Sequence, residues 1–254
     1  MDRAGEGAQV LVDVVLPCLN EAAALPHVLG TLPQGYRGVV VDNGSSDGSP
    51  EIARGLGALV VSEPRRGYGA ACHAGLTAAT APIVAFADAD ASIDLSELAA
   101  LVALVVAAEA DLALGRRLTS EPGSWPVHAR VSNQVLAWYL RQRFHWQISE
   151  ISPVRVARRT ALLDLGLTDR RSGYPLETLL RAGRAGWTVR EVTITYRPRM
   201  GRSKVTGTLR GTATAVADMA SAILADVGQA GRGSKGWRRA DLSRTSTRRT
   251  WPSS

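Results

Sequence analysis

The sequence is poor in cysteine and has no long hydrophobic run. Its 254 residues include only two cysteines, Cys18 and Cys72. Two cysteines exclude a disulfide framework, and these two lack the paired spacing of a metal site. We therefore expect both to be small buried residues in a protein of a reducing compartment. No stretch approaches the roughly 20 uninterrupted apolar residues of a membrane-spanning helix.

The first residues, MDRAGEGAQ, also lack the charged and then apolar pattern of a secretory signal. The sequence therefore predicts a cytoplasmic protein. Apolar residues make up 45% of the chain, which is enough to bury the core of one large domain. We expect this domain at residues 1–230, followed by a basic tail at residues 231–254.

Positive charge is concentrated in that tail. The formal net charge is +7, and the tail from Arg232 onward holds seven basic residues against the single acid Asp241, so the rest of the chain is nearly neutral. A nearly neutral body argues against nucleic acid as a partner. Two interpretations of the tail remain open: a disordered, solvated segment, or a weak peripheral contact with the anionic inner face of a membrane.

Short apolar runs alternate with alanine-rich helical stretches in the first half of the chain. The runs are apolar on both faces, which is typical of buried parallel strands. We expect strands at residues 10–16, 38–41, 58–61, 82–87 and 111–114, and helices at residues 21–32, 50–56, 69–79 and 95–108. The second half predicts helices at residues 125–144 and 209–225, another helix starting near Pro175, and a strand at residues 188–196. This alternation predicts an α/β, Rossmann-like fold with a mostly parallel central sheet flanked by helices.

Three expected strands end in polar clusters: LPCLNE (residues 16–21), VDNGSSD (residues 41–47) and FADAD (residues 86–90). A single cluster of this kind is explained by an ordinary turn, because Asp, Asn, Gly and Ser favour turns. Ligands of open α/β sheets bind at the carboxyl ends of the strands. Three clusters at the same edge therefore indicate a shared polar ligand.

Asp88 and Asp90 stand two residues apart, so on an extended chain both side chains point to one side. Two carboxylates, completed by water and phosphate oxygens, are typical of a Mg²⁺ or Mn²⁺ site. From this pair alone, a strand-end turn with capping aspartates is an equal alternative.

The segment EPRRGYGAACHAGL (residues 63–76) places arginines and glycines directly before a helix. Glycine lets a backbone approach a ligand, and a helix N-terminus favours anions, so Arg66 is a candidate phosphate contact. A plain junction between loop and helix is the alternative.

Together these segments resemble glycosyltransferase family 2, whose members have the GT-A fold and use nucleotide sugars. VVLPCLNEAAALPHVL resembles the opening strand of the family and its P-x-x-N-E turn. VVVDNGSSDGS resembles its D-(D/S)-G-S-x-D-G-(S/T) segment, RRGYGAACHAGL its basic-Gly-x-Gly-x-Ala stretch, and FADAD its D-x-D motif. The resemblance runs from about residue 10 to residue 211 and predicts a nucleotide-sugar half at about residues 8–117 and an acceptor half at about residues 118–230.

The resemblance also implies roles for single residues of the nucleotide-sugar half. It places Arg66 near the nucleotide, and makes Asp88 and Asp90 the pair that holds Mg²⁺ or Mn²⁺ against the diphosphate. The residues that it implies around the base and ribose are Pro17, Asn20, Glu21, Asp42 and Asn43. Position 43 is often a second Asp in the family, so Asn43 is a departure that bears on donor selectivity.

In the acceptor half, ISEISPVRVARR resembles a stretch of the polyprenyl-phosphate sugar transferase branch, with Glu150 where Asp is usual. The stretch from SGYPLE to GRSK resembles the acceptor loop, helix and R-x-G-x-S-K segment of that branch. The resemblance makes Glu150 and Glu177 candidate catalytic acids that face the acceptor. The expected phosphate and acceptor contacts are Arg155, Arg199, Ser203 and Lys204.

These residues predict a metal-dependent transferase that moves a sugar from a UDP- or GDP-sugar to a polyprenyl phosphate or another small acceptor, with inversion at the anomeric carbon. Glu150 or Glu177 is a general base if the acceptor is a hydroxyl, and a positioning acid if it is already an anionic phosphate. Sugar phosphoglycerate synthesis is disfavoured, because related enzymes use a late His as a metal ligand and YRPRMGRSK has none. The alternatives are a sugar-phosphate nucleotidyltransferase and a non-catalytic nucleotide-sugar-binding protein. Sugar, nucleotide, acceptor, stereochemical outcome and oligomeric state stay open.

Overall fold

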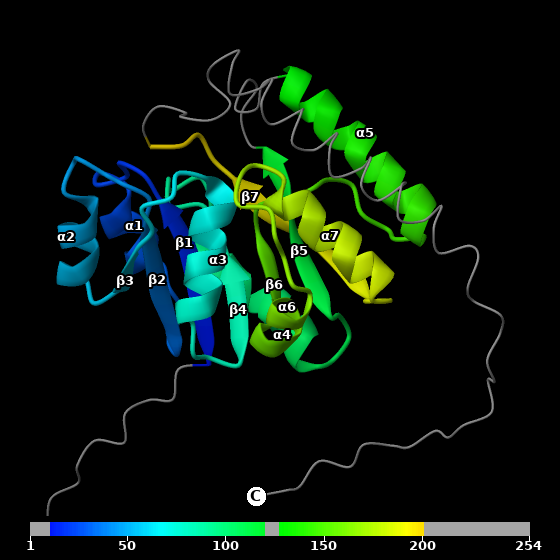
Figure 1. Cartoon of the computed structure of the whole chain (residues 1–254), viewed down its shortest axis with the longest axis horizontal. Helices are drawn as coiled ribbons and strands as arrows, with labels where there is room; N and C mark the ends of the chain where they lie inside the picture. The colour runs from blue at the N-terminus through cyan, green and yellow to red at the C-terminus, as the bar shows by residue number, and fades with distance from the viewer. Residues whose placement is uncertain (1–10, 120–126, 201–254) are drawn as a thin grey trace, which may run out of the picture.

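The computed structural model describes residues 11–119 and 127–200, with a seven-stranded sheet at its centre (Figure 1). The expected helix at residues 209–225, the tail, Ser203 and Lys204 lie outside the described residues. The strands are β1 Val12–Cys18, β2 Tyr36–Asp42, β3 Leu59–Ser62, β4 Ile83–Phe86, β5 Leu112–Thr119, β6 Arg155–Arg158 and β7 Val189–Tyr196.

The sheet has the order β3-β2-β1-β4-β6-β5-β7, and every strand except β6 runs in the same direction. The predicted mostly parallel α/β sheet is therefore confirmed. The antiparallel strand β6 escaped prediction, because its sequence RVAR is only four residues long and half arginine. It pairs with β4 on one side and with β5 on the other.

Helices cover both faces of the sheet (Figure 1). One face packs against α1 Leu25–Gly30, α2 Ser49–Gly55 and α4 Leu98–Val106, which follows the short 3₁₀ turn η1 Leu95–Glu97. The other packs against α3 Tyr68–Ala78, α5 Val127–Phe144, α6 Arg159–Asp164 and α7 Tyr174–Arg184. Two cores result, one on each side, which explains why the central strands are apolar on both faces.

The first helix is shorter than the predicted 21–32. Asn20 takes a left-handed conformation, with φ 54°, directly after β1. The next backbone N–H groups then bind side chains of another loop, Glu21 to Ser49 Oγ at 2.9 Å and Ala22 to Asp47 Oδ2 at 3.0 Å. Helix α1 therefore starts only at Leu25, and residues 19–22 are held at the sheet edge.

The two ends of the parallel strands, which form opposite edges of the sheet, differ in the polar groups that they carry. At the amino end of β1, the buried carboxylate of Asp13 accepts hydrogen bonds from Arg37 Nε and Nη2 and from the backbone N–H groups of Thr80 and Ala81, at 2.7 to 2.9 Å. The opposite edge collects the carboxyl ends of the parallel strands. Because β6 is antiparallel, its first residue, Arg155, lies there too, paired with Phe86 of β4 and Leu114 of β5.

Candidate active site

The polar loops after β1 and β2 bind each other at this edge. Asn20 N–H donates to Ser45 Oγ at 2.9 Å, and Asn20 Oδ1 accepts from Ser46 N–H at 2.7 Å. Together with the hydrogen bonds of Glu21 to Ser49 and of Ala22 to Asp47, these bonds connect the loop after β1 to the loop after β2. Several Asn, Ser and Asp residues of the two motifs therefore shape the edge of the sheet, where the sequence suggested ligand contacts alone.

Asn43 holds the next loop. Its amide nitrogen donates to the carbonyl oxygens of Glu63 and Arg65, both at 2.8 Å, and its amide oxygen accepts from Gly67 N–H at 2.9 Å. An Asp here would set an anionic oxygen against two carbonyl oxygens, which repel it. The local structure thus explains the departure from the family's Asp: Asn43 positions the loop that carries Arg66.

The glycines at the start of α3, Gly67 and Gly69, do not open that helix to an anion. The N–H groups of Gly69 and Ala70 donate to the carbonyl oxygens of Arg171 and Arg170, both at 2.9 Å. A Cβ on Gly67 would lie 2.2 Å from Arg170 O. The glycines permit close approach of the protein's own loop, so the expected binding of a phosphate at this helix N-terminus has no free donors at these two positions. Arg66 itself is exposed, and its Nη2 donates to Gly44 O at 3.3 Å.

A cavity of about 260 Å³ lies between these loops. Predicted residues from all three strand ends line it, together with Tyr68 and Ala71 of α3. The predicted residues that the structure brings together here are Pro17, Glu21, Asn43, Arg66, Asp88 and Arg199. The cavity therefore joins the expected nucleotide residues to one residue of the expected acceptor half.

Asp88 and Asp90 follow β4 at the side of this cavity. Burial raises the pKa of Asp88 to about 6, and the charge of Asp90 adds to the rise, whereas Arg117, Arg199 and Arg155 oppose it. Asp90 is buried, and its Oδ2 lies 2.6 Å from Arg199 Nη2. The site thus combines two crowded carboxylates with several arginines.

Glu150 is bound to one of those arginines. Its carboxylate accepts from the backbone N–H of Arg117 at 2.8 Å and from the guanidinium Nε and Nη2 at 3.1 to 3.3 Å. Both side chains are nearly buried, with 7% and 10% of their surface exposed. Arg117 also stacks on Tyr196, with 5.4 Å from its Cζ to the ring centroid. Sequence reasoning missed Arg117, because nothing in GRRLT distinguishes it from its exposed neighbour Arg116.

Arg155 lies behind the site. It is 1% exposed, and its guanidinium lies over the rings of Phe86 and Tyr174, 5.1 and 5.7 Å from their centroids. Nη1 donates to Thr178 Oγ1, whereas Nε and Nη2 have no hydrogen-bond partner among the described residues. In this position Arg155 acts on Asp88 through its charge, without direct access to the cavity.

Glu177 is engaged by its own loop. Its carboxylate accepts from the N–H groups of Thr168 and Asp169 at 2.7 to 3.1 Å, from the Thr168 hydroxyl at 2.8 Å, and pairs with Arg181 at 2.8 Å. This loop continues into Arg170 and Arg171, which bind the start of α3. The structure therefore places Glu177 as a support of the cavity wall, and its side chain does not line the cavity itself.

The segments that form this site are shared with a known protein family. A model of Glycosyl transferase family 2 matches residues 13–164, which include the loops after β1, β2 and β4. This chain is a family 2 glycosyltransferase.

Relatives of this glycosyltransferase cover most of its length. An uncharacterized glycosyltransferase of Mycobacterium tuberculosis (strain ATCC 25618 / H37Rv) is 54% identical over 208 residues, which cover 82% of this chain and 95% of the relative. A dolichyl-phosphate hexose transferase of Haloferax volcanii is 31% identical over 196 residues, which cover 76% of this chain and 85% of the relative.

Among solved structures, this glycosyltransferase resembles glucosyl-3-phosphoglycerate synthase from Mycobacterium tuberculosis in complex with Mn²⁺, UDP-glucose and phosphoglyceric acid. The TM-score is 0.68 at 22% identity, over 85% of this chain and 79% of that one. At this identity the likeness establishes the shared fold and confirms the predicted GT-A architecture.

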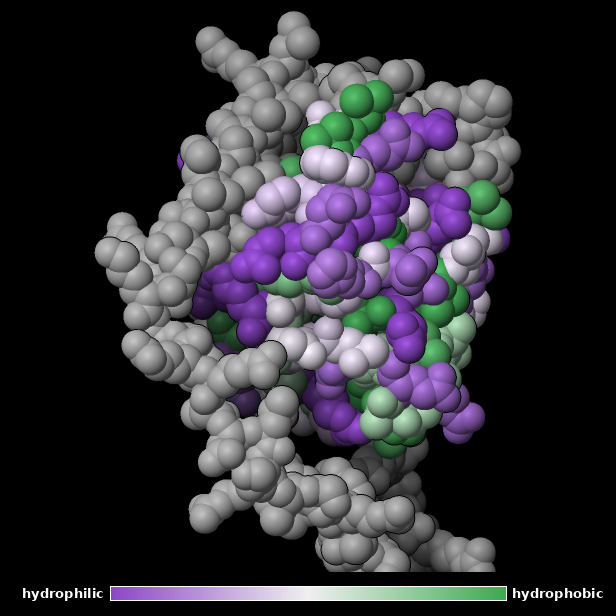
Figure 2. Space-filling view, turned by 90° about the vertical axis from the view of Figure 1, so that its right-hand side faces the viewer, coloured by the Kyte–Doolittle hydropathy of each residue, from purple (hydrophilic) through white to green (hydrophobic). Residues whose placement is uncertain are grey.

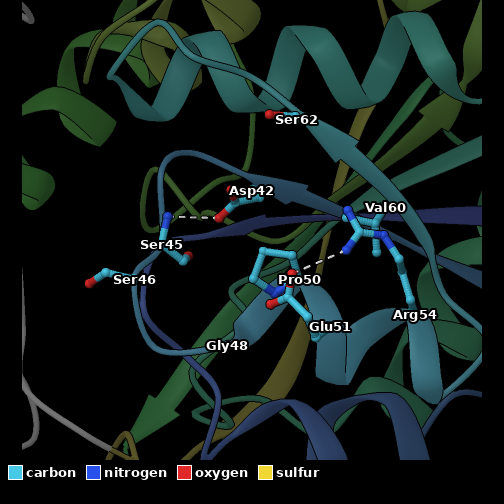
Figure 3. Close-up of a pocket in the computed structure, with 9 residues that line it drawn as sticks. All are labelled: Asp42, Ser45, Ser46, Gly48, Pro50, Glu51, Arg54, Val60 and Ser62. Atoms are coloured by element: carbon cyan, nitrogen blue, oxygen red, sulfur yellow. Dashed lines mark hydrogen bonds and ion pairs between the residues drawn. The ribbon is translucent and has the colours of Figure 1, made fainter.

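The glycosyltransferase has a second polar cavity, of about 430 Å³ (Figure 3). Asp42 reaches this cavity, although it is adjacent to Asn43, because consecutive side chains at a strand end point to opposite sides. Asp42 Oδ1 accepts from Ser45 N–H at 2.9 Å, and Arg54 pairs with Glu51, three residues before it on α2 (Figure 3). The expected base and ribose contacts are therefore divided: three line the first cavity, Asp42 lines the second, and Asn20 lines neither.

Proposed function

We propose that this family 2 glycosyltransferase moves a sugar from a nucleotide diphosphate sugar to an acceptor phosphate, with a polyprenyl phosphate as the acceptor. The observation that carries the proposal is the state of the two candidate bases. Glu150 and Glu177 are both occupied by arginine and backbone N–H donors, while Arg117 and Arg199 lie near Asp88 and Asp90. A phosphate acceptor is already anionic and needs arginine contacts more than it needs a base.

The residues present fit a divalent cation. Asp88 lines the cavity of about 260 Å³, and burial together with the charge of Asp90 raises its pKa to about 6, a rise that a bound cation would oppose. No group of three or more His, Cys, Asp or Glu side chains suited to a metal occurs in residues 11–119 and 127–200. The candidate site is instead the pair Asp88 and Asp90. Two carboxylates suit Mg²⁺ or Mn²⁺, with phosphate oxygens and water as further ligands. The cation would stabilise the charge of the leaving diphosphate.

The chain's own residues would then act by position and charge. The acceptor phosphate oxygen attacks the anomeric carbon from the side opposite the diphosphate, the bond between that carbon and the diphosphate oxygen breaks, and the configuration inverts. Arg66 and Arg199 line the cavity and would bind the departing diphosphate. Arg117, held by Glu150, does not line the cavity and would favour the acceptor phosphate through its charge, and Asn43 would hold the loop of Arg66 in place.

A lipid acceptor would agree with the surface of α5. Val131, Val135 and Trp138 are 51 to 58% exposed and lie on one face of this helix, because they are spaced by four and three residues. The helix has no acidic residue, and Arg130 and Arg141 are exposed on it. On the side of the molecule that includes α5, hydrophilic residues form most of the described surface and hydrophobic residues form separate small patches (Figure 2). We propose a peripheral contact of this helix with an anionic membrane.

None of the described helices is long and apolar enough to cross a membrane. The proposed contact would therefore rest on interfacial side chains and charge.

The test has two steps. Calorimetric titration of UDP, GDP and their sugar conjugates, with Mn²⁺ or with EDTA, should give metal-dependent binding of one nucleotide that Asp88→Asn removes. The preferred donor is then offered to polyprenyl phosphate, polyprenol, 3-phosphoglycerate and glycerol 3-phosphate. Transfer to polyprenyl phosphate with none to polyprenol supports the phosphate acceptor. Transfer to polyprenol refutes it, and transfer only to a small phosphate refutes the lipid.

The two alternatives predict other results. A nucleotidyltransferase would release pyrophosphate from a nucleoside triphosphate and a sugar phosphate. A non-catalytic binding protein would bind the nucleotide tightly and transfer to none of the four acceptors.

A further inference from the structure

The chain that leaves β7 is fastened to the loop of Asp90. Ile93 and Tyr196 form an antiparallel bridge, Arg197 N–H donates to Ser92 O, and Met200 N–H donates to Asp90 O, both at 2.9 Å. Arg199 is thus held beside Asp90 by main-chain bonds on both sides. These backbone bonds fix the position of the Arg199 backbone next to Asp90, so the ion pair does not depend on a flexible surface segment.

Both oxygens of the Asp90 carboxylate already have donors. Oδ2 lies 2.6 Å from Arg199 Nη2, and Oδ1 accepts from Ser92 N–H at 3.0 Å. The Asp90 side chain is 5% exposed and that of Arg199 is 32% exposed, so water screens the pair only in part. A divalent cation at Asp90 would meet a neutralised carboxylate and a guanidinium a few ångströms away, which repels it.

A diphosphate changes this balance. Arg199 lines the same cavity as Asp88 and Arg66, so its guanidinium has room to bind phosphate oxygens, for which its planar fork is suited. The negative charge of the diphosphate would attract both the guanidinium and the cation. Arg199 can then give up Asp90 without losing an anionic partner.

We propose that Arg199 and the divalent cation compete for Asp90, and that the nucleotide diphosphate ends this competition by binding Arg199 itself. The inference rests on the proposed metal-dependent donor site and adds a linkage between its two ligands. The cation binds weakly alone and strongly with the nucleotide, and by reciprocity the cation strengthens nucleotide binding by the same factor. The Arg199 guanidinium thereby changes its partner from Asp90 to the diphosphate when the donor site is filled.

The test measures Mn²⁺ affinity of the full chain without nucleotide, from the paramagnetic resonance signal of free Mn²⁺. Arg199→Gln should bind Mn²⁺ about 5- to 150-fold more tightly than the unaltered protein, the usual range for such coupling. Saturating UDP should shrink this difference or reverse it. The matched control is Arg197→Gln, which removes an equal charge two residues away, from a guanidinium 3.9 Å from Asp94. It should stay within about twofold, since exposed charges are screened.

Arg199→Met serves as a second neutral variant, and thermal unfolding verifies that each variant is folded. Unchanged or weaker Mn²⁺ binding by folded Arg199→Gln or Arg199→Met, without nucleotide, overturns the competition. The donor site is judged separately. If the unaltered protein with UDP binds no Mn²⁺, or if Asp88→Asn leaves that binding intact, the metal site itself is wrong and the linkage falls with it.

Discussion

Two buried aspartates at opposite edges of the sheet are each paired with an arginine, and their surroundings differ. Asp13 is fully buried and accepts four hydrogen bonds, two from Arg37 and two from backbone N–H groups. Asp90 has one arginine and one backbone N–H, and another carboxylate, Asp88, stands two residues away. The protein itself supplies all four donors of Asp13, whereas Asp90 lies beside a cavity and near the like charge of Asp88.

This difference teaches how to separate a structural carboxylate from one that serves a ligand. Burial alone does not do so, since both aspartates are buried. The deciding features are the number of donors that the protein supplies and the presence of a second uncompensated acid. By these features Glu177 belongs with Asp13, because its own loop and Arg181 supply several donors to its carboxylate.

The largest expected effect is that of Asp90→Asn on ligand binding. We expect the affinity for UDP with Mn²⁺ to fall by at least about 100-fold, which corresponds to about 2.7 kcal/mol. The free energy of unfolding should change by less than about 1 kcal/mol, because Asp90 accepts from only one arginine and one backbone N–H, and the substitution also removes its repulsion with Asp88. Calorimetry and urea unfolding measure the two quantities. A large loss of stability with intact binding would place Asp90 in the same class as Asp13.

Only one side of this contrast was predictable from the sequence, because nothing in the sequence singled out Asp13. Asp88 and Asp90 stand out because they follow an apolar strand at the edge where two other polar clusters end. The role of Asn43 was hidden, since its three partners lie 20 to 24 residues away along the chain. Arg117 and the closed start of α3 depend on long-range packing between the two halves. No local sequence pattern predicts such contacts. The short antiparallel strand β6, which brings the two halves together, was not predictable from its sequence either.

Asp13→Asn should act on stability and leave binding intact. The substitution removes a charge that holds Arg37 and two backbone N–H groups, so we expect a loss of about 2 kcal/mol in the free energy of unfolding. The affinity of the folded protein for UDP with Mn²⁺ should stay within about twofold of the unaltered value. Urea unfolding followed by titration measures both. Weakened binding in a fully folded variant would contradict the division between the two edges.

Glu177→Gln should have a smaller effect, about 1 kcal/mol of stability, because the neutral amide keeps an oxygen for the loop but loses the charge that Arg181 and the N–H groups favour. The affinity for the nucleotide should fall only a few-fold, through the loop that binds the start of α3. Glu109→Gln, which removes an equal charge from an exposed side chain outside this loop, is the control for a general change of charge. If Glu177→Gln abolished transfer while leaving stability and nucleotide binding unchanged, Glu177 would be a catalytic base after all.

The smallest expected effect is the pH dependence that belongs to Asp13 alone. Burial by itself raises the pKa of Asp13, but the hydrogen bonds from Arg37, Ala81 and Thr80 outweigh it, so the pKa lies below its ordinary value of 3.8. A group with a lowered pKa stabilises the fold above its unfolded pKa and loses that contribution as the pH falls through its folded pKa. The difference in unfolding free energy between the unaltered protein and Asp13→Asn should therefore be constant above about pH 5 and shrink steadily below pH 3.8. Urea unfolding of both proteins across this range measures it, and a difference that grows as the pH falls would show that Arg37 does not stabilise the charged form.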